Sequence, residues 1–296
     1  MNLNQLAIFH AVANAGNLTR AAQVLCISQP AVSKQLRALE KSLGTALFHR
    51  LSKGVQLTEA GHLLREYSGR IFALETEAEQ ALAELRELQR GRLIIGASTT
   101  IGIYLLPEFL GVFQQLHPRI ELQLEIANTQ KIQQELCASK IDLALTEGIL
   151  EGAEWQADIF ARDEIIIVAA KEHALSKRKT LTINQIKNER ILLRETGSGT
   201  RDIIERAFGE KQIPLAFVMS LGDTEALKRA VMSGMGIAFL SRRAVENELK
   251  FGELIELRLE DWKIERNFYR LRLKGNYESR SAREFMRLLK QFCAEA

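Results

Sequence analysis

The chain has 296 residues, of which 46% are hydrophobic and 26% charged, and these values predict a soluble globular protein of two or three compact units. No apolar run is long enough to span a bilayer, and the first residues lack the basic start and cleavage site of a secretion signal. The formal net charge is only +3. The three cysteines lack CxxC spacing, which argues against a zinc site, and we expect neither a metal nor a cofactor. Their small number and scattered positions fit a protein of the reducing cytoplasm.

The first 44 residues predict three helices. Residues 1–16 form an amphipathic helix pattern, whose Leu6, Phe9 and Val12 would pack against a helix pair that follows. The first helix of that pair begins near Asn17, a good N-cap, and buries Leu18, Ala22 and Leu25. Cys26 follows this apolar stripe, so we expect it in the core.

The second helix of the pair has two distinct faces. Its apolar residues recur at i, i+4, i+7 and i+11, a spacing that predicts one buried stripe comprising Val32, Leu36, Leu39 and Leu43. The opposite face carries Ser33, Lys34, Arg37 and Lys41. Ser28 is a plausible N-cap, and Pro30 is tolerated because first-turn N–H groups have no partner in the helix. This layout is that of a helix-turn-helix, which places a helix in the major groove of DNA.

Charge and the next segment favour this interpretation over an ordinary amphipathic pair with a solvated side. Residues 1–57 hold six basic residues and one acid, a net charge of +5, so the remainder carries −2. Such a segregated basic module suits a polyanion. Residues 47–58 predict a hairpin, or wing, with Arg50 and Lys53 beside the DNA backbone or minor groove.

This N-terminal pattern resembles the LysR-type transcriptional regulators. The resemblance rests on a dense set of positions: Ala21, Ala22, Leu25, residues 28–33, Leu36, Leu39, Glu40, Leu43, Gly44, Leu47, Phe48, Arg50 and residues 57–61. Lys53 departs from the arginine of many relatives, which keeps the charge but makes a bidentate contact less favourable.

The expected DNA-contacting residues lie on the helix pair and the hairpin. Gln29, Ser33, Lys34 and Arg37 are candidates for base or backbone contacts, and Arg20, Arg50 and Lys53 for phosphate or minor-groove contacts. The full predicted set is Thr19, Arg20, Ser28, Gln29, Pro30, Ser33, Lys34, Arg37, Arg50 and Lys53.

Residues 58–90 predict one long linker helix that ends at Gly91. Its apolar residues keep alternating steps of four and three over about four heptads. These residues are Ala60, Leu64, Tyr67, Ile71, Leu74, Ala78, Ala81, Leu85 and Leu88. A seam this narrow favours a coiled coil with a second copy over a helix lying on its own core. The sequence leaves the orientation open, and the family resemblance implies an antiparallel pair.

Beyond Gly91 the pattern changes to alternating strands and helices, which predicts mostly parallel sheets with helices on both faces, in two small α/β lobes. Candidate strands are residues 92–97, 121–127, 142–146, 164–170, 190–194, 217–221, 237–241, 254–259 and 266–273. Ligands bind beyond the carboxyl ends of strands in such sheets.

Hydroxyl-bearing residues recur at these strand ends and would make an anion-friendly crevice, to which Arg201 adds a charge. Each position is also explained by a simple turn or N-cap. The candidate effector-binding residues are Ser98, Thr99, Thr100, Thr129, Thr146, Ser198, Thr200, Arg201 and Thr224.

The resemblance extends over this half, which is similar to the effector-binding half of LysR-type regulators and hence to periplasmic binding proteins. It implies a winged helix-turn-helix domain at 1–57, a linker helix at 58–90, lobe I at 91–161 and 266–296, and lobe II at 162–265. The segments at 98–102, 194–201 and 233–243 resemble regulators of carbon fixation and sulfur assimilation.

The sequence thus predicts a cytoplasmic, non-enzymatic transcriptional regulator that binds double-stranded DNA at two related half-sites and a small anionic effector. Scattered histidines and the pair Asp163–Glu164, which we interpret as a solvated strand start, give no catalytic pattern. Alternatives are a DNA-binding protein without a ligand and a cytoplasmic solute-binding protein. The sequence leaves three questions open: whether the protein is a homodimer or a homotetramer, whether it activates transcription with RNA polymerase as partner, and whether Cys137 and Cys293 form a redox pair.

Overall fold

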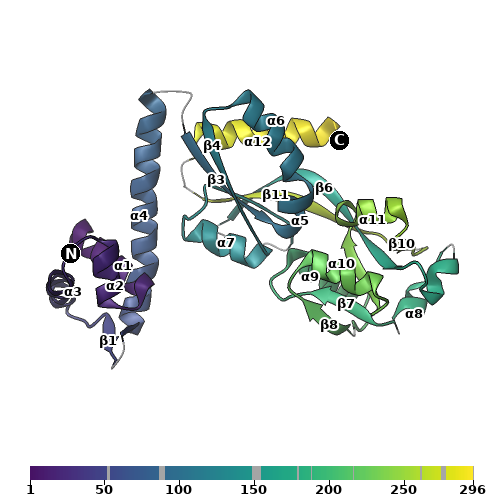
Figure 1. The fold of residues 1–296 in the computed structure, drawn as a ribbon, viewed down its shortest axis with the longest axis horizontal. Coiled ribbons are helices and arrows are strands. Elements are labelled where there is room, and N and C mark those ends of the chain that lie inside the picture. The colour runs from purple at the N-terminus through teal and green to yellow at the C-terminus, as the bar shows by residue number, and fades with distance from the viewer. Residues whose placement is uncertain are drawn as a thin grey trace. The chain divides into compact units, whose positions relative to one another are not determined.

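A computed structural model describes residues 1–51, 54–86, 91–148, 155–178, 180–187, 189–215, 217–260, 262–274 and 278–295. The chain divides into an N-terminal unit, Met1–Gln80, and a C-terminal unit, Ala81–Ala296 (Figure 1). Within the described residues, no helix is both long and apolar enough to cross a membrane.

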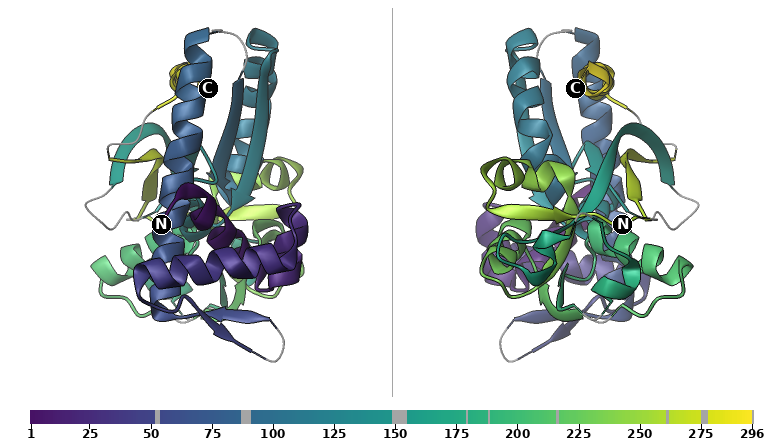
Figure 2. Two further views of the ribbon diagram at one scale, coloured as in Figure 1. Left: turned by 90° about the vertical axis from the view of Figure 1, so that its left-hand side faces the viewer. Right: turned by 90° about the vertical axis from the view of Figure 1, so that its right-hand side faces the viewer.

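The N-terminal unit is the predicted winged helix-turn-helix. Its elements in chain order are α1 (Leu3–Ala15), α2 (Leu18–Val24), α3 (Gln29–Leu43), β1 (Phe48–Arg50), β2 (Val55–Leu57) and the long α4 (Glu59–Arg86). The side chain of Asn17 accepts from two N–H groups of α2, and that of Ser28 accepts from the N–H of Ala31, so both predicted N-caps are confirmed. Figure 2 shows the β1–β2 hairpin projecting away from the three helices.

Most of the predicted apolar stripe of α3 is buried, but its end and one flank differ from prediction. Val32 and Leu39 are fully buried, whereas Leu43 is 38% exposed because the core ends one turn earlier. Ser33, expected on the exposed side, is only 9% exposed. Cys26 is also exposed rather than in the core, since it holds a left-handed turn conformation (φ 53°) between the two helices.

The first part of α4 packs on the helical core of its own unit. Ala60, Leu64 and Ile71 of the predicted seam contact that core, together with Phe72. Other apolar residues of α4 are exposed in the described part of the chain, namely Leu63, Tyr67, Leu74 and, beyond the end of this unit, Leu82. The predicted seam is therefore divided: some of its residues pack on the core of their own unit, and others are exposed to solvent. The side chains of Ala81 and Leu85 and the whole of Leu88 lie outside the described residues, as do residues 87–90, and Gly91 begins a strand.

Gly61 has no room for a side chain in the first turn of α4. A Cβ there would meet the Leu47 carbonyl oxygen at 2.1 Å, whereas a Cβ at Gly69 would meet nothing within 4 Å. We expect Gly61→Ala to lower the free energy of unfolding of the N-terminal unit by about 1–3 kcal/mol through overpacking. Gly69→Ala, its matched control, should raise it by up to about 1 kcal/mol through helix propensity. Urea unfolding of both variants checks this, and equal effects would contradict it.

The C-terminal unit is built on one nine-stranded sheet that joins two α/β lobes. The sheet order is β4-β3-β5-β11-β6-β9-β7-β8, with β10 pairing β6. Lobe I here denotes the helices α5 (Thr99–Tyr104), α6 (Leu106–Leu116), α7 (Thr129–Cys137) and α12 (Arg280–Glu295) with the strands β3 (Gly91–Ser98), β4 (Ile120–Ala127) and β5 (Leu143–Thr146).

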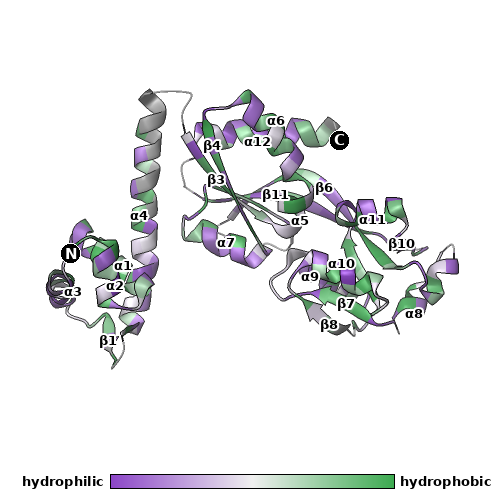
Figure 3. Ribbon diagram, viewed as in Figure 1, coloured by the Kyte–Doolittle hydropathy of each residue, from purple (hydrophilic) through white to green (hydrophobic). Residues whose placement is uncertain are grey.

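Lobe II follows the first of two long crossing strands, β6 (Trp155–Ala170), and the second, β11 (Ile264–Leu273), returns the chain to lobe I. Its strands are β7 (Ile191–Arg194), β8 (Phe217–Leu221), β9 (Ile237–Ser241) and β10 (Leu254–Leu257). Its helices are α8 (Ile183–Ile186), α9 (Gly199–Glu210), α10 (Thr224–Met232) and α11 (Glu246–Phe251), with short 3-10 turns at Ala174–Lys177 and Arg242–Val245. Figure 3 shows hydrophobic colour along β7.

The strands appear where the sequence predicts them, but the sheet is mixed rather than mostly parallel. Pairing is parallel within each lobe, between β3 and its neighbours β4 and β5 and between β7 and its neighbours β8 and β9. The crossing strands β6 and β11 run antiparallel over ten paired residues. The sequence predicts that β6 begins at Glu164, whereas the strand begins at Trp155. Its first half lacks the continuous apolar run of the second half, and most of its residues are exposed or half-buried.

Helices cover both faces of the lobe I sheet. α6 and α12 pack with β3 and β5 on one face, and α7 packs on the other (Figure 1). Cys293 belongs to α12 and Cys137 to α7, so the sheet separates the two thiols. Burial raises the pKa of the Cys293 thiol. This arrangement gives no support to redox pairing within one chain.

Candidate DNA interface and interlobe cleft

Seven of the ten predicted DNA-contacting residues are exposed, and an eighth, Ser33, is buried. Along α2 and α3, the side chains of Thr19, Arg20, Ser28, Gln29, Pro30, Lys34 and Arg37 are all exposed. Ser33 is the exception, and its Oγ accepts a hydrogen bond from Nη2 of Arg37 at 3.0 Å. Ser33 is thus placed to orient Arg37 rather than to reach DNA by itself. The side chain of Arg50 and the whole of Lys53 lie outside the described residues.

The single acid of this basic region has a structural role. Oε1 of Glu40 accepts from the backbone N–H of Leu47 at 2.8 Å and of Phe48 at 3.4 Å. This carboxylate therefore fixes the start of the hairpin to α3. It leaves the exposed turns of the helix without a competing negative charge.

The predicted effector-binding residues converge between the lobes. Seven of them are at most 3% exposed, namely Ser98, Thr100, Thr129, Thr146, Ser198, Thr200 and Thr224. Thr99 is half-buried. Since hydroxyl groups buried this deeply need partners, their hydrogen bonds show how the two lobes meet.

Arg266, on the crossing strand β11, lies at the centre of this cluster. Its Nε contacts Asp163 Oδ2 at 2.7 Å, Nη1 donates to Thr200 Oγ1 at 2.8 Å, and Nη2 donates to Thr100 Oγ1 at 3.2 Å. Glu147 is also paired with it, at 3.4 Å. Asp163 is 8% exposed, so the interpretation of this acid as a solvated strand start is wrong. The pairing register of β6 with β11 places it directly opposite Arg266.

A second buried arginine, Arg194, ends β7. Its guanidinium forms a bidentate pair with Glu195, Nε to Oε2 at 2.8 Å and Nη2 to Oε1 at 3.0 Å. It also donates to Thr224 within lobe II and to Thr99 of lobe I, the latter at 3.4 Å. Arg201, the predicted cation, instead pairs with Glu205 on the outer part of α9 and donates to the Arg194 carbonyl. Arg194 therefore holds the position we expected for Arg201.

Contacts across the cleft show that the lobes are closed on each other. The Gln130 N–H donates to the Gly197 carbonyl at 3.1 Å, and the Asn128 amide donates to Glu195 at 3.2 Å. A Cβ added to Gly199 would meet the Glu147 carbonyl oxygen at 2.2 Å, so the approach requires glycine there. Among the described groups, Thr146 Oγ1 is buried in this region without a hydrogen-bond partner.

A separate set of contacts joins α5 of lobe I to α10 of lobe II. The Tyr104 hydroxyl donates to Glu225, and burial together with this hydrogen bond raises the pKa of Tyr104. Lys228, 4% exposed, pairs with both Glu225 and Glu248 at 2.7 Å. This cluster is a second cross-lobe contact, independent of the arginines.

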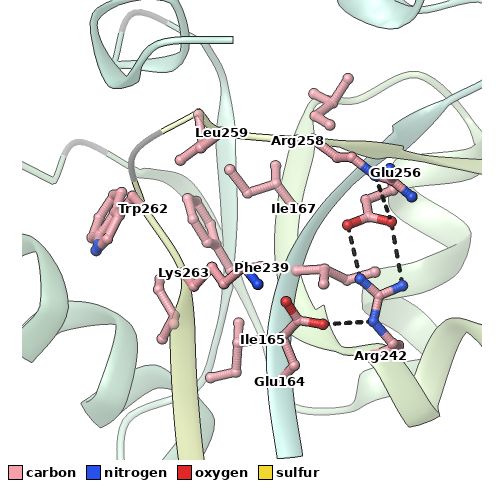
Figure 4. A pocket seen from close by; sticks show the side chains of 13 residues that line it. Glu164, Ile165, Ile167, Phe239, Arg242, Glu256, Arg258, Leu259, Trp262 and Lys263 are labelled. Carbon is pink, nitrogen blue, oxygen red and sulfur yellow. Dashed lines mark hydrogen bonds and ion pairs between the residues drawn. The ribbon is translucent and has the colours of Figure 1, made fainter. Parts of the chain in front are cut away.

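Sequence reasoning missed the charged residues of the cleft, namely Arg194, Arg266, Glu147, Asp163 and Glu195. Glu147, Arg194 and Glu195 stand at strand ends, where their charge was an available signal. Asp163 and Arg266 stand among other charged or polar residues of the crossing strands, so the sequence did not set them apart. A cavity of about 310 Å³ in lobe II, lined by Glu164, Arg242, Glu256 and Trp262 among others, includes none of the predicted effector residues in its lining (Figure 4). Arg242 closes one side of it by pairing with Glu164 and Glu256.

Comparison with known proteins agrees with both halves. Residues 3–62 match the family described as bacterial regulatory helix-turn-helix protein, lysR family, and residues 86–294 match the LysR substrate binding domain. The RuBisCO operon transcriptional regulator of Allochromatium vinosum is 35% identical over 96% of this chain and 94% of its own length. A probable RuBisCO transcriptional regulator of Synechocystis is 36% identical over 98% and 86% of the respective chains.

Solved structures show the same architecture. The Synechocystis CcmR regulatory domain, in complex with 2-PG, is 28% identical with a TM-score of 0.64, covering 69% of this chain and 98% of that one. Full-length CbnR complexed with its target DNA has a TM-score of 0.72 at 20% identity, over 98% and 99% of the chains, and supports the fold. The chain therefore belongs to the LysR family and is a DNA-binding transcriptional regulator with an effector-binding half.

Proposed function

We propose that this regulator controls promoters of carbon-fixation genes in response to a small anionic metabolite held between lobes I and II. The observation that carries the proposal is the pair of buried arginines, Arg194 and Arg266, surrounded by hydroxyl groups at the interlobe cleft. Guanidinium groups with hydroxyl neighbours suit carboxylate or phosphate ligands. The relatives that regulate RuBisCO operons support the choice of target genes.

The proposed division of the chain assigns DNA binding to residues 1–57, dimerisation to 58–90, lobe I to 91–161 and 266–296, and lobe II to 162–265. The pairing of Arg162 with Asn267 supports the lobe boundaries, because both chain crossings occur at that level. DNA contact falls to the exposed surface of α2 and α3 and to Arg50 and Lys53 of the hairpin. Because the proposed task of the protein is DNA binding, we propose that it acts in the cytoplasm and catalyses no reaction.

Self-association is the proposed role of the exposed apolar residues of α4. Leu63, Tyr67, Leu74 and Leu82 are each more than half exposed, and a second α4 would bury them. Two reader helices at a fixed separation then bind two related half-sites. A tetramer would place four readers on one promoter, and RNA polymerase is the partner if the output is activation.

The proposed control is a shift between cleft conformations. A ligand changes the equilibrium by binding the open and closed states with unequal affinity. Closure alters how subunits pack and hence the spacing or bend of the bound half-sites. The related CcmR regulatory domain binds 2-PG. For this chain we choose 2-phosphoglycolate, a small anion that carries both a phosphate and a carboxylate, as the first probe.

Thr200→Val is expected to leave operator binding intact and to reduce the response to 2-phosphoglycolate. The change keeps the side-chain volume but removes the hydroxyl that accepts from Arg266 at 2.8 Å. We expect about a tenfold weaker ligand effect, the value of one hydrogen bond to a charged group. Footprinting of a promoter fragment across a ligand titration measures it, and loss of operator binding by a folded variant would count against a cleft role.

One observation favours a second candidate, a regulator that needs no ligand: the hydrogen bonds of Arg194 and Arg266 are already satisfied within the protein. The same footprints separate the two. An operator affinity of the unmodified protein that no small anion changes would support the ligand-independent function.

A further inference from the structure

The closed cleft holds a carboxylate of the protein itself against Arg194, one of its two buried guanidinium groups. Glu195 is the residue after β7, and both of its carboxylate oxygens contact the Arg194 guanidinium. The same carboxylate accepts from Asn128 of lobe I at 3.2 Å. Arg194 itself donates to Thr99 of lobe I. A single carboxylate therefore accepts hydrogen bonds from residues of both lobes.

We propose that Glu195 is an internal stand-in for the effector, which occupies the anion position at Arg194 until a ligand anion displaces it. This inference rests on the proposed anionic effector, because it names the residue that such an anion must replace. Without ligand, the Glu195 carboxylate satisfies Arg194 and holds lobe II to Asn128. With ligand, Glu195 leaves Arg194 and Asn128, and the ligand anion, instead of Glu195, determines how closely the two lobes meet.

The balance of charge in the cleft requires that a ligand anion replace one carboxylate rather than bind in addition to all three. Three carboxylates, those of Glu147, Asp163 and Glu195, surround the two buried guanidinium groups of Arg194 and Arg266. A further anion entering this set would bring the excess of negative charge to two or more. Burying an uncompensated charge costs several kcal/mol, so one carboxylate has to move out.

Exposure identifies which carboxylate moves. The side chain of Glu195 is 25% exposed, whereas those of Glu147 and Asp163 are 3% and 1% exposed. Asp163 is held further by Ser241 at 2.9 Å, and Glu147 by Ser98. Glu195 stands instead in the turn that leads to α9, and rotating its side chain into water breaks contacts only with Arg194 and Asn128 among those described.

Glu195→Gln tests the proposal because the amide keeps the shape and an acceptor for Asn128 but removes the charge. With full-length protein and 2-phosphoglycolate in isothermal titration calorimetry, we expect binding at least about tenfold tighter, since the ligand no longer competes with a charged contact. The ligand-free melting temperature should fall, while the ligand-induced rise in melting temperature should increase. Glu210→Gln, at an exposed pair with Arg206, should change neither.

The outcomes separate this inference from the proposed function. If the unmodified protein binds 2-phosphoglycolate and Glu195→Gln binds it equally or more weakly, Glu195 contacts the ligand or plays no part, and the stand-in is overturned while the anionic effector stands. If neither protein binds 2-phosphoglycolate or inorganic phosphate, both proposals fail. Circular dichroism of each variant shows that the fold is retained.

Discussion

Arg266→Leu is expected to lower the free energy of unfolding of the C-terminal unit by about 3–5 kcal/mol, the usual cost of removing one partner of a buried ion pair. The guanidinium is 1% exposed, and its loss leaves the carboxylates of Asp163 and Glu147 buried without a counter-charge. The hydroxyls of Thr100 and Thr200 lose their donor as well. Urea unfolding of the full chain, followed by far-ultraviolet circular dichroism, measures the change.

Arg206→Leu is the matched control, because Arg206 is also an ion-paired arginine but both partners are more than 60% exposed. We expect it to change the free energy of unfolding by less than about 1 kcal/mol. Asp163→Asn in the Arg266→Leu background should recover part of the loss, since it removes one of the two unpaired charges. Equal effects of the two single arginine variants would show that the cleft centre is not the buried network described above.

The double variant Lys34→Ala, Arg37→Ala is expected to weaken operator binding at least about thirtyfold with the fold unchanged. Both side chains are exposed on α3 and lie N-terminal to its last turn, on the side of a recognition helix that reaches base edges. Each good contact to a base or phosphate contributes about 1–3 kcal/mol. Fluorescence anisotropy with a labelled promoter fragment, at several salt concentrations, measures the affinity and its salt dependence.

Lys41→Ala is the control on the same helix, because Lys41 lies in the last turn of α3. Its replacement removes one positive charge, where the double variant removes two. It should weaken binding much less and mainly at low salt. An unchanged affinity of the double variant, or an equal loss with Lys41→Ala, would show that α3 does not enter the groove with its N-terminal half.

Ser33 illustrates what periodicity can and cannot predict. The spacing of Val32, Leu36 and Leu39 correctly fixed the buried face of α3, because that face follows from helix geometry alone. Ser33 stands at the border of that face, and its burial depends on how closely α3 packs against the other helices. The burial of a residue at such a border depends on tertiary packing, which helical periodicity does not predict.

In the cleft, too, some features were predictable from the sequence and others depended on tertiary structure. The hydroxyl residues at strand ends were predictable because parallel strands bring their carboxyl ends to one edge. The partners that satisfy them were not, since Arg266 is far from Thr100 and Asp163 along the chain. It meets Asp163 through the register of β6 with β11, and it meets Thr100 through a hydrogen bond to α5 that depends on tertiary packing. That register required knowing which strands cross between the lobes, and the weak apolar pattern in the first half of β6 concealed it.

The two crossing strands also determine what kind of motion the effector half can perform. β6 and β11 are hydrogen-bonded to each other over ten residue pairs, and the register shifts between Phe268 and Tyr269. Such an irregularity concentrates twist at one point of a two-stranded ribbon. Any relative rotation of the lobes would have to twist this paired ribbon, because both chain crossings belong to it. An effector that holds the lobes at another angle would keep the ribbon twisted for as long as it stays bound.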